Sequence, residues 1–364
     1  MTILSLIGKK KGPSAGSLDR QAWHRFRRNP LSIASLVVIG LFALVALLGY
    51  LITPDPTPYC NQQYLELATL KPGSKATMLC VDNPSAPHTR TSLLHRMTQG
   101  EPLSYSVTPI KEYRYARDTL VATPYNGEPI AVPQREARIE QRTFVLGTDA
   151  YGRDVLSMLM IGSRVSLSVG FIAIAIALLI GITLGALAAY HGGWVDNVVM
   201  WFINVVWSIP TVLLVIAITF ALGKGFWQIF VAVGLTMWVD IARVVRGEVL
   251  SIKEKEYVEA TRALGYSTFR TIFRHILPNC LGAVVVVAAS NFASAILLEA
   301  GLSFLGIGVQ PPMPSWGMMV KENYGYILLD SAYLALLPGL AIMLIVLAFM
   351  LLAGGLRDAL DVKQ

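Results

Sequence analysis

The stretch SIKEKEYVEATRALGYSTFRTIFRHILPN, residues 251–279, is a polar island between two strongly apolar parts of the chain. Ser251, followed three residues later by Glu254, forms a capping-box pattern that predicts the start of a helix. Gly265 stands where a left-handed C-terminal cap is expected, and Ser267 can cap a second helix. The stretch therefore predicts two short helices that meet at an elbow.

The second helix of this elbow should carry one apolar stripe. Its apolar residues recur at the spacing of a helix, at Phe269, Ile272, Phe273 and Ile276. Pro278 is expected to end or kink the helix, and a membrane-length apolar run follows it. We interpret the elbow as a pair of helices exposed on one face of a membrane protein. The alternative is a cytosolic amphipathic hairpin with no special partner.

The composition indicates a membrane protein. Of 364 residues, 54% are hydrophobic and 15% are charged, whereas a soluble domain carries roughly 25% charged residues. The net charge of +7 could suggest nucleic acid as a partner. The basic residues cluster beside apolar runs, however, as the positive-inside rule describes, so no nucleic-acid partner is expected.

Six apolar runs predict an all-α polytopic membrane protein with six transmembrane helices. The expected spans are residues 31–52, 165–190, 197–222, 225–243, 279–298 and 331–355. The first has 22 uncharged residues, or about 33 Å of helix, which is enough to cross the bilayer core. The third and sixth contain Pro210 and Pro338, which should kink them.

The fourth span is the weakest of the six, because only 14 uncharged residues precede Asp240. It has to extend over Asp240 and Arg243, which we place near the cytoplasmic boundary and expect to form a local pair. Glu299 is similarly expected to end the fifth span. In the second span, Gly181 and Gly185 are four residues apart and predict a close approach to another helix.

The order of spans sets the topology. The basic N-terminal segment, residues 1–30, should be cytoplasmic, and a cleaved signal peptide is not expected. The same count places residues 53–143 outside, the loop 244–278 inside and the tail 357–364 inside. The remaining core of five helices covers residues 144–356.

The segment 53–143 is rich in proline and should form an extracytoplasmic insert of mixed loop and β structure. Cys60 and Cys80 both lie in it, so we expect one disulfide, which would stabilise the insert by roughly 3 kcal/mol. Two free thiols are the alternative. After the insert, Thr148 or Asp149 should cap the next helix, and Arg153 could pair with Asp149 and Asp154.

The elbow also carries a family resemblance. Glu259-Ala260-Thr261, Gly265 four residues later and then Leu277-Pro278 resemble the EAA loop of permease subunits of bacterial ATP-binding-cassette (ABC) importers. The sequence of the elbow is most similar to that of permeases from the dipeptide, oligopeptide and nickel class of importers. Segments 146–170 and 301–327 resemble the same family, in the same order. Thr261 stands where alanine is usual, and His275 where many relatives have an aliphatic residue.

The resemblance implies a type I ABC importer permease fold in the bacterial inner membrane, as half of a translocation pathway. It implies a second related permease, two ATPase subunits that bind ATP and magnesium, and an extracytoplasmic solute-binding protein as partners. It also implies contact with the ATPase through five elbow residues, which are Glu259, Ala260, Thr261, Leu264 and Gly265.

The chain itself is not expected to be an enzyme or to hold a cofactor or metal. It has no GxxxxGK[ST], GxSxG or HExxH motif, and its five histidines are scattered. A secondary transporter would need ionisable residues at mid-membrane and usually an internal repeat, and a membrane-anchored receptor would need fewer spans. The solute stays open: a peptide is the first choice, followed by nickel chelates, glutathione or other small solutes.

Overall fold

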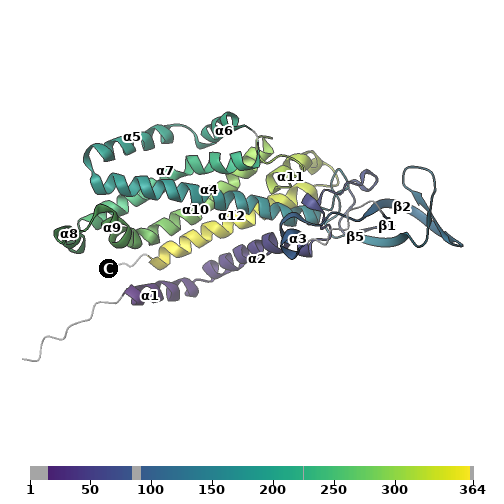
Figure 1. Ribbon diagram of the computed structural model, residues 1–364, viewed down its shortest axis with the longest axis horizontal. Helices are drawn as coiled ribbons and strands as arrows, with labels where there is room; N and C mark the ends of the chain where they lie inside the picture. Colours follow the sequence, from purple (N-terminus) through teal and green to yellow (C-terminus); the bar gives the residue numbers. More distant parts are fainter. Residues whose placement is uncertain (1–14, 84–91, 224, 361–364) are drawn as a thin grey trace, which may run out of the picture.

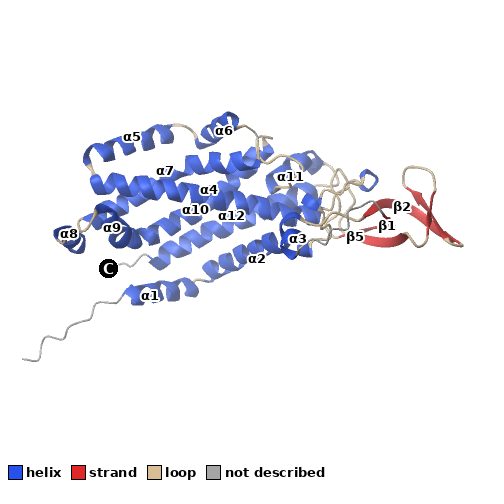
Figure 2. Cartoon of the chain, in the orientation of Figure 1, coloured by secondary structure: helices blue, strands red, loops and turns tan. Residues whose placement is uncertain are grey.

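The computed structural model describes residues 15–83, 92–223 and 225–360. The described chain forms an elongated body of helices that run side by side, with a small β-sheet at one end (Figures 1 and 2). The short helices α8 and α9 of the elbow lie at the other end, together with α1 and the end of α12.

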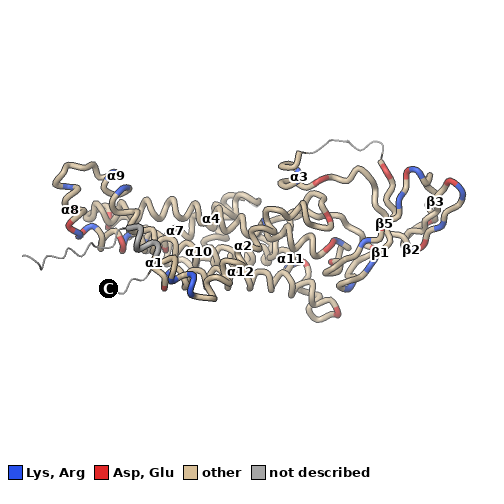
Figure 3. The backbone as a smooth tube through the Cα atoms, turned by 90° about the horizontal axis from the view of Figure 1, so that it is seen from below, with Lys and Arg blue, Asp and Glu red and all other residues tan. Residues whose placement is uncertain are grey.

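Five described helices are long and apolar enough to cross a membrane. They are α2 (Pro30–Ile52), α4 (Val155–His191), α7 (Phe226–Lys253), α10 (Leu277–Phe304) and α12 (Tyr333–Leu360). Pro338 lies inside α12 without ending it. Lys and Arg residues gather at the elbow end and in the sheet, and few mark the middle of the helical body (Figure 3). This distribution suits a body whose middle lies in hydrocarbon.

The expected third span is two helices, α5 (Gly193–Ser208) and α6 (Thr211–Leu222), bent by 96°. Ile209 and Pro210, between them, have extended ψ angles of 129° and 125°. Proline cannot donate to the helix ladder and disfavours a helical residue before it, so the change is a break and not the predicted kink. The described chain thus has five helices that could span a membrane, or six candidate spans if the bent pair counts as one.

The α4–α7 pair packs closely through glycine, as the spacing of Gly181 and Gly185 predicts. A Cβ added to Gly185 would lie 2.4 Å from the Ala242 carbonyl oxygen, and one added to Gly181 would lie 2.8 Å from that of Trp238. Only glycine therefore lets the two backbones approach so closely.

The basic N-terminal segment contains helix α1 (Ala15–Arg28). The side chain of Asn29 then caps α2 by accepting from the backbone N–H groups of Leu31 at 3.0 Å and Ser32 at 3.3 Å. Pro30 occupies the first turn of α2, where its missing N–H costs nothing.

The insert between α2 and α4 holds a five-stranded antiparallel sheet in the order β4-β3-β2-β1-β5. The strands are β1 (Ser74–Asp82), β2 (Tyr105–Ala116), β3 (Thr119–Pro124), β4 (Ile130–Pro133) and β5 (Ala137–Phe144). The insert also has the short elements η1 (Pro58–Cys60), η2 (Leu65–Leu67) and α3 (Leu93–Gln99). A small core of Leu79, Ile110 and Leu120 lies on one face of the sheet.

The insert is tied to the helical body by hydrogen bonds. The Tyr333 hydroxyl donates to the Leu70 carbonyl at 2.7 Å, and the Asp55 N–H donates to the Ser157 hydroxyl at 3.0 Å. The sheet is therefore attached through the loops before it and not only through its two chain connections.

The expected disulfide is wrong, because Cys60 and Cys80 are both free and buried in the structure. The Cys60 thiol belongs to the core cluster of the helical body and donates to the Asp55 carbonyl at 3.0 Å. The Cys80 thiol lies on β1, 3.5 Å from a Glu140 carboxylate oxygen. The two thiols are buried against different partners. Their location in the same insert was therefore not enough to predict that they pair.

Candidate functional sites: the elbow and a cavity beside the broken helix

The first helix of the elbow begins later than expected. Helix α7 continues through Ser251 to Lys253, and α8 (Glu256–Ala263) starts with Lys255 as an N-cap that makes no side-chain cap bond. The capping-box prediction at Ser251 is therefore wrong. The reason is packing: Ile252, beside Ser251, is buried and holds that turn of α7 against the helical body.

The turn between the two elbow helices is as predicted. Gly265 has φ +73°, the left-handed conformation that glycine adopts without strain. Its N–H donates to the Arg262 carbonyl at 2.9 Å, and the Tyr266 N–H donates to the Thr261 carbonyl at 3.0 Å. The Ser267 hydroxyl then caps α9 (Thr268–Thr271) by accepting from the Arg270 N–H at 3.4 Å.

The second helix does not end at Pro278. Helix α9 passes through the π-helical segment Ile272–Ile276 into α10, and Pro278 lies in the first turn of α10. A π-helical turn is wider than an α-helical one and suits a proline just beyond it. Thr268 to Phe304 therefore form one long helix, and of the two expected outcomes at Pro278 the helix end is wrong.

The predicted apolar stripe of this helix divides into two halves. Ile272 and Ile276 are buried, whereas Phe269 and Phe273 are exposed with their ring centroids 4.3 Å apart. Leu264, beside the Gly265 turn, is 71% exposed and Phe269 is 69% exposed. Large apolar side chains this exposed form an apolar patch at this end of the molecule.

Four of the five predicted contact residues lie on the outside of the elbow. Glu259, Ala260, Leu264 and Gly265 are exposed, but Thr261 is 5% exposed. The Thr261 hydroxyl donates to the Val258 carbonyl at 2.7 Å and lies 3.4 Å from the Thr271 hydroxyl. We therefore correct its expected role: Thr261 joins the two elbow helices from inside. We name the outer set, with Phe269 and Phe273, the elbow surface.

The elbow is fixed to the neighbouring end of α4. The Lys253 ammonium donates to the carbonyls of Ala189 at 3.1 Å and Tyr190 at 2.7 Å. The Arg262 guanidinium lies 5.2 Å from the Tyr190 ring centroid. These last-turn carbonyls of α4 lack helical partners and attract cations, so Lys253 attaches the start of the elbow to the end of α4.

At the opposite end of α4, Arg153 forms ion pairs with a different set of residues from the one expected. Arg153 pairs with Asp149, as predicted, and with Glu322, the residue before Asn323 at the end of α11 (Trp316–Asn323). Asp154 instead caps α4 by accepting from the Ser157 N–H at 2.8 Å, so neither Thr148 nor Asp149 is the cap. Sequence spacing could not show Glu322, which is 169 positions away from Arg153.

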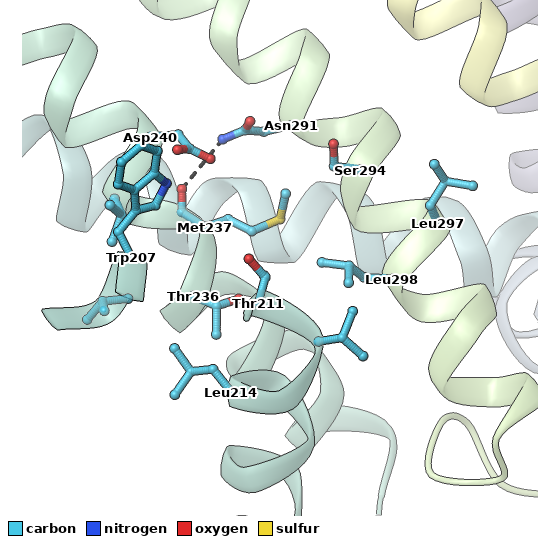
Figure 4. A pocket seen from close by; sticks show the side chains of 13 residues that line it. Trp207, Thr211, Leu214, Thr236, Met237, Asp240, Asn291, Ser294, Leu297 and Leu298 are labelled. Carbon is cyan, nitrogen blue, oxygen red and sulfur yellow. Dashed lines mark hydrogen bonds between the residues drawn. The ribbon is translucent and has the colours of Figure 1, made fainter. Parts of the chain in front are cut away.

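A second candidate site is a cavity of about 460 Å³ beside the α5–α6 break. Its walls come from α5, α6, α7 and α10 (Figure 4). Its polar lining is Thr211, Thr236, Asp240, Asn291 and Ser294, and its apolar lining includes Leu214, Leu297 and Leu298. The volume lies within the range of about 300–1,000 Å³ typical of small-molecule sites.

Asp240 does not form the expected ion pair, and it lies well inside its helix. It lies at the middle of α7, about 20 Å from either end at 1.5 Å per residue. Among the described residues it forms no ion pair with Arg243. The Arg243 guanidinium lies 3.8 Å from the Trp207 ring centroid instead. This cation–π contact holds the end of α5 against α7 and forms one wall of the cavity.

Helix α10 does not end at Glu299 but continues to Phe304. Glu299 is fully buried and accepts hydrogen bonds from the hydroxyls of Ser303 at 2.7 Å and Ser166 at 3.1 Å. The Ser303 hydroxyl also accepts from the Val309 N–H at 3.2 Å, so this carboxyl group orders the turn after α10. Among the described residues, no group of three or more His, Cys, Asp or Glu could hold a metal ion.

With this architecture in view, comparison with known families is decisive. Residues 181–363 match the family described as binding-protein-dependent transport system inner membrane component, and the chain belongs to it. Residues 17–72 match the N-terminal TM domain of oligopeptide transport permease C. The chain is thus a multi-pass inner-membrane permease subunit of an ABC importer.

Individual relatives agree with this class. A glutathione transport system permease protein of Pectobacterium atrosepticum is 42% identical over 218 residues, 60% of this chain and 72% of that protein. A dipeptide transport system permease protein of Alkalihalophilus pseudofirmus is also 42% identical over 218 residues, 60% of this chain and 71% of that protein. Among solved structures, a chain of the MetNI methionine ABC transporter is 21% identical, with 57% of this chain and 98% of that chain covered and a TM-score of 0.46.

Proposed function

We propose that this permease forms half of the translocation pathway for di- or oligopeptides, or a similar small solute, and couples to a separate ATPase through the elbow surface. A second related permease supplies the other half, two ATPases bind ATP and magnesium, and an extracytoplasmic binding protein delivers the solute. The names of the relatives support this solute class, since they are dipeptide and glutathione permeases.

The observation that carries the coupling proposal is the exposure of the elbow surface. Leu264, Phe269 and Phe273 present apolar area beside the Glu259 carboxylate, at the end of the body away from the sheet (Figure 1). A protein interface needs such apolar anchors with a polar rim. The hydrogen bonds of Lys253 to the end of α4 provide the route by which the elbow moves the body.

The mechanism follows from these connections. Closure of the ATPase dimer moves the elbow, and α4, α7 and α10, which are attached to it, swing between an inward-open and an outward-open arrangement. Helices packed through glycine, as α4 and α7 are, move as one body because their backbones are in contact. The outward-open arrangement receives the solute from the binding protein.

The proposed topology counts the α5–α6 pair as one broken span, which gives six spans. The elbow and both termini are then cytoplasmic, and the sheet is outside. Cysteine placed at Lys253 or Arg262, in a chain whose three native cysteines are replaced by serine, should be labelled by an impermeant maleimide only from the cytoplasmic side. Labelling from outside would contradict both the topology and the ATPase contact.

The experiment that tests the function is co-purification from membranes that contain the neighbouring subunits. An importer permease brings its ATPases and a second permease with it, and the complex hydrolyses ATP faster when the loaded binding protein is present. A secondary transporter or a receptor brings no ATPase. Isolation of this chain alone, under conditions where the ATPase subunits are present and soluble, would reject the proposal.

A further inference from the structure

The cavity beside the α5–α6 break contains a carboxylate that the proposed coupling does not use. Asp240 lines the cavity from the middle of α7 and is exposed to it, and the described residues provide it with no ion-pair partner. In a helix apolar enough to cross a membrane, a carboxylate that forms no ion pair is costly unless it faces water or a ligand, so Asp240 is a candidate for a functional role.

The polar and the apolar residues that line the cavity lie in different parts of it. Figure 4 shows Asp240, Asn291 and Trp207 gathered in one part, and Leu297 and Leu298 further away. The Asn291 side-chain N–H donates to the Met237 carbonyl at 3.5 Å, which fixes the amide beside α7. The cavity therefore offers one anionic, hydrogen-bonding part and one apolar part.

The cation that could have neutralised Asp240 is occupied elsewhere. Arg243 lies one helical turn further along α7, but its guanidinium is stacked over the Trp207 ring at 3.8 Å. Trp207 itself lines the cavity. Arg243 thus packs on a residue of the wall, and its charge acts on Asp240 only from beyond ion-pair distance, so the Asp240 carboxylate can still accept an arriving cation.

We propose that Asp240 is a solute-binding residue of the pathway, whose carboxylate receives the protonated amino group of a passing solute while the apolar part of the cavity takes the solute's side chains. The proposal rests on the proposed function, in which this cavity belongs to the translocation pathway. Peptides and glutathione share a free amino group of this kind. An ammonium group forms a charge-assisted hydrogen bond with a carboxylate, which is stronger than a neutral one.

The test uses the assembled importer in membrane vesicles and uptake of radiolabelled L-alanyl-L-alanine, with labelled glutathione as a second probe. Asp240→Asn keeps the shape and removes the charge, and Asp240→Glu keeps the charge. Asp330→Asn is the control, because the Asp330 side chain is 94% exposed, outside the cavity, in a surface pair with Lys71. Each variant is also measured for co-purification of the ATPases and for ATP hydrolysis stimulated by the binding protein.

Asp240→Asn should assemble normally and lower uptake of the probe that wild-type vesicles accept by at least about tenfold, the effect of losing one charged hydrogen bond. Asp240→Glu should retain most of the uptake, and Asp330→Asn should match wild type. Wild-type uptake by assembled Asp240→Asn would overturn the assignment. Loss of assembly in Asp240→Asn with recovery in Asp240→Glu would overturn it too, because the carboxylate would then pair with the second permease. If wild-type vesicles accept neither probe, the proposed solute class itself fails.

Discussion

The Asp196 carboxylate of α5 accepts two parallel hydrogen bonds from the Arg246 guanidinium of α7, at 2.6 and 2.7 Å. The side chains are 17% and 27% exposed, respectively. This two-pronged geometry is the strongest form of a carboxylate–arginine pair. It fixes the first turn of α5 to α7, seven residues before α7 ends at Lys253 and the elbow begins. The pair therefore sets the distance between the broken helix and the coupling segment.

Removal of one partner should destabilise the body. Arg246→Gln should lower the free energy of unfolding by about 1.5–3 kcal/mol, because it leaves a partly buried carboxylate without its charged donors. Thermal unfolding of the purified complex measures this loss. The exchange of the two residues, Asp196→Arg with Arg246→Asp, should recover part of it. An exchange variant that is less stable than both single variants would show that the geometry, and not the pairing, matters.

The α4–α7 contact allows a matched pair of glycine substitutions. Gly185→Ala places a Cβ 2.4 Å from the Ala242 carbonyl oxygen, and should lower the free energy of unfolding by about 1–3 kcal/mol through overpacking. Gly40→Ala in α2 adds the same atom with no other atom within 4 Å, and should be neutral or slightly stabilising because alanine favours a helix. Equal thermal stability of the two variants would contradict the close packing.

The apolar runs predicted where the spans lie but not where the helices end. The apolar span was expected from residue 165 and the helix cap at Thr148 or Asp149, and α4 begins between these positions, at Val155. Its extra turns contain polar residues that hydropathy counts against a span. In the structure these residues have partners: the Asp154 carboxylate accepts from the Ser157 N–H at 2.8 Å, and the Arg164 guanidinium donates to the Met97 carbonyl at 2.6 Å. Such hydrogen bonds depend on how the insert packs on α4 in the folded protein, so hydropathy alone does not predict them.

The residues of the candidate sites also fall into those that the sequence predicts and those that it does not. Gly265 and Ser267 were predictable, because the turn and the cap depend on each residue's own backbone preference. The inward direction of the Thr261 side chain was not predictable. It depends on where α8 begins, and α8 begins at Glu256 because packing extends α7 up to Lys253. The position of Asp240 within its helix was not predictable for the same reason: α7 extends to Lys253, which places Asp240 at the middle of the helix.

The cysteines should react as free thiols once the protein is unfolded. Without reduction, alkylation in denaturant followed by mass mapping should find Cys60, Cys80 and Cys280 all modified. In the folded protein at pH 8, Cys60 and Cys80 should react slowly. Burial raises the pKa of both thiols, and nearby carboxylates, Asp55 and Glu140, raise them further. Because the thiolate is the reactive form, a raised pKa lowers the reactive fraction. A Cys60–Cys80 peptide pair found before reduction would contradict the structure.

The exposed phenylalanines of the elbow surface should be anchors of the ATPase contact. Phe269→Ala should weaken co-purification of the ATPase by at least about tenfold in affinity, since buried aromatic anchors are worth about 2 kcal/mol or more at an interface. Leu328→Ala is the control, because Leu328 is 94% exposed in η4 (Tyr324–Leu328), away from the elbow. Equal ATPase recovery with both variants would show that the proposed docking face is elsewhere.

The last prediction concerns the turn of the elbow. Gly265 has φ +73° and open space around its Cα, and asparagine and aspartate both tolerate this left-handed backbone. Gly265→Asn therefore tests shape, and Gly265→Asp adds one charge to the same shape. We expect both variants to insert into the membrane and Asn to support nearly normal uptake. The buried, unpaired carboxylate of Gly265→Asp should disturb docking, so ATP hydrolysis continues while uptake falls by about tenfold or more. Normal uptake by Gly265→Asp would remove Gly265 from the contact, and an equal loss in both variants would show that the turn itself, rather than the docked surface, is what coupling requires.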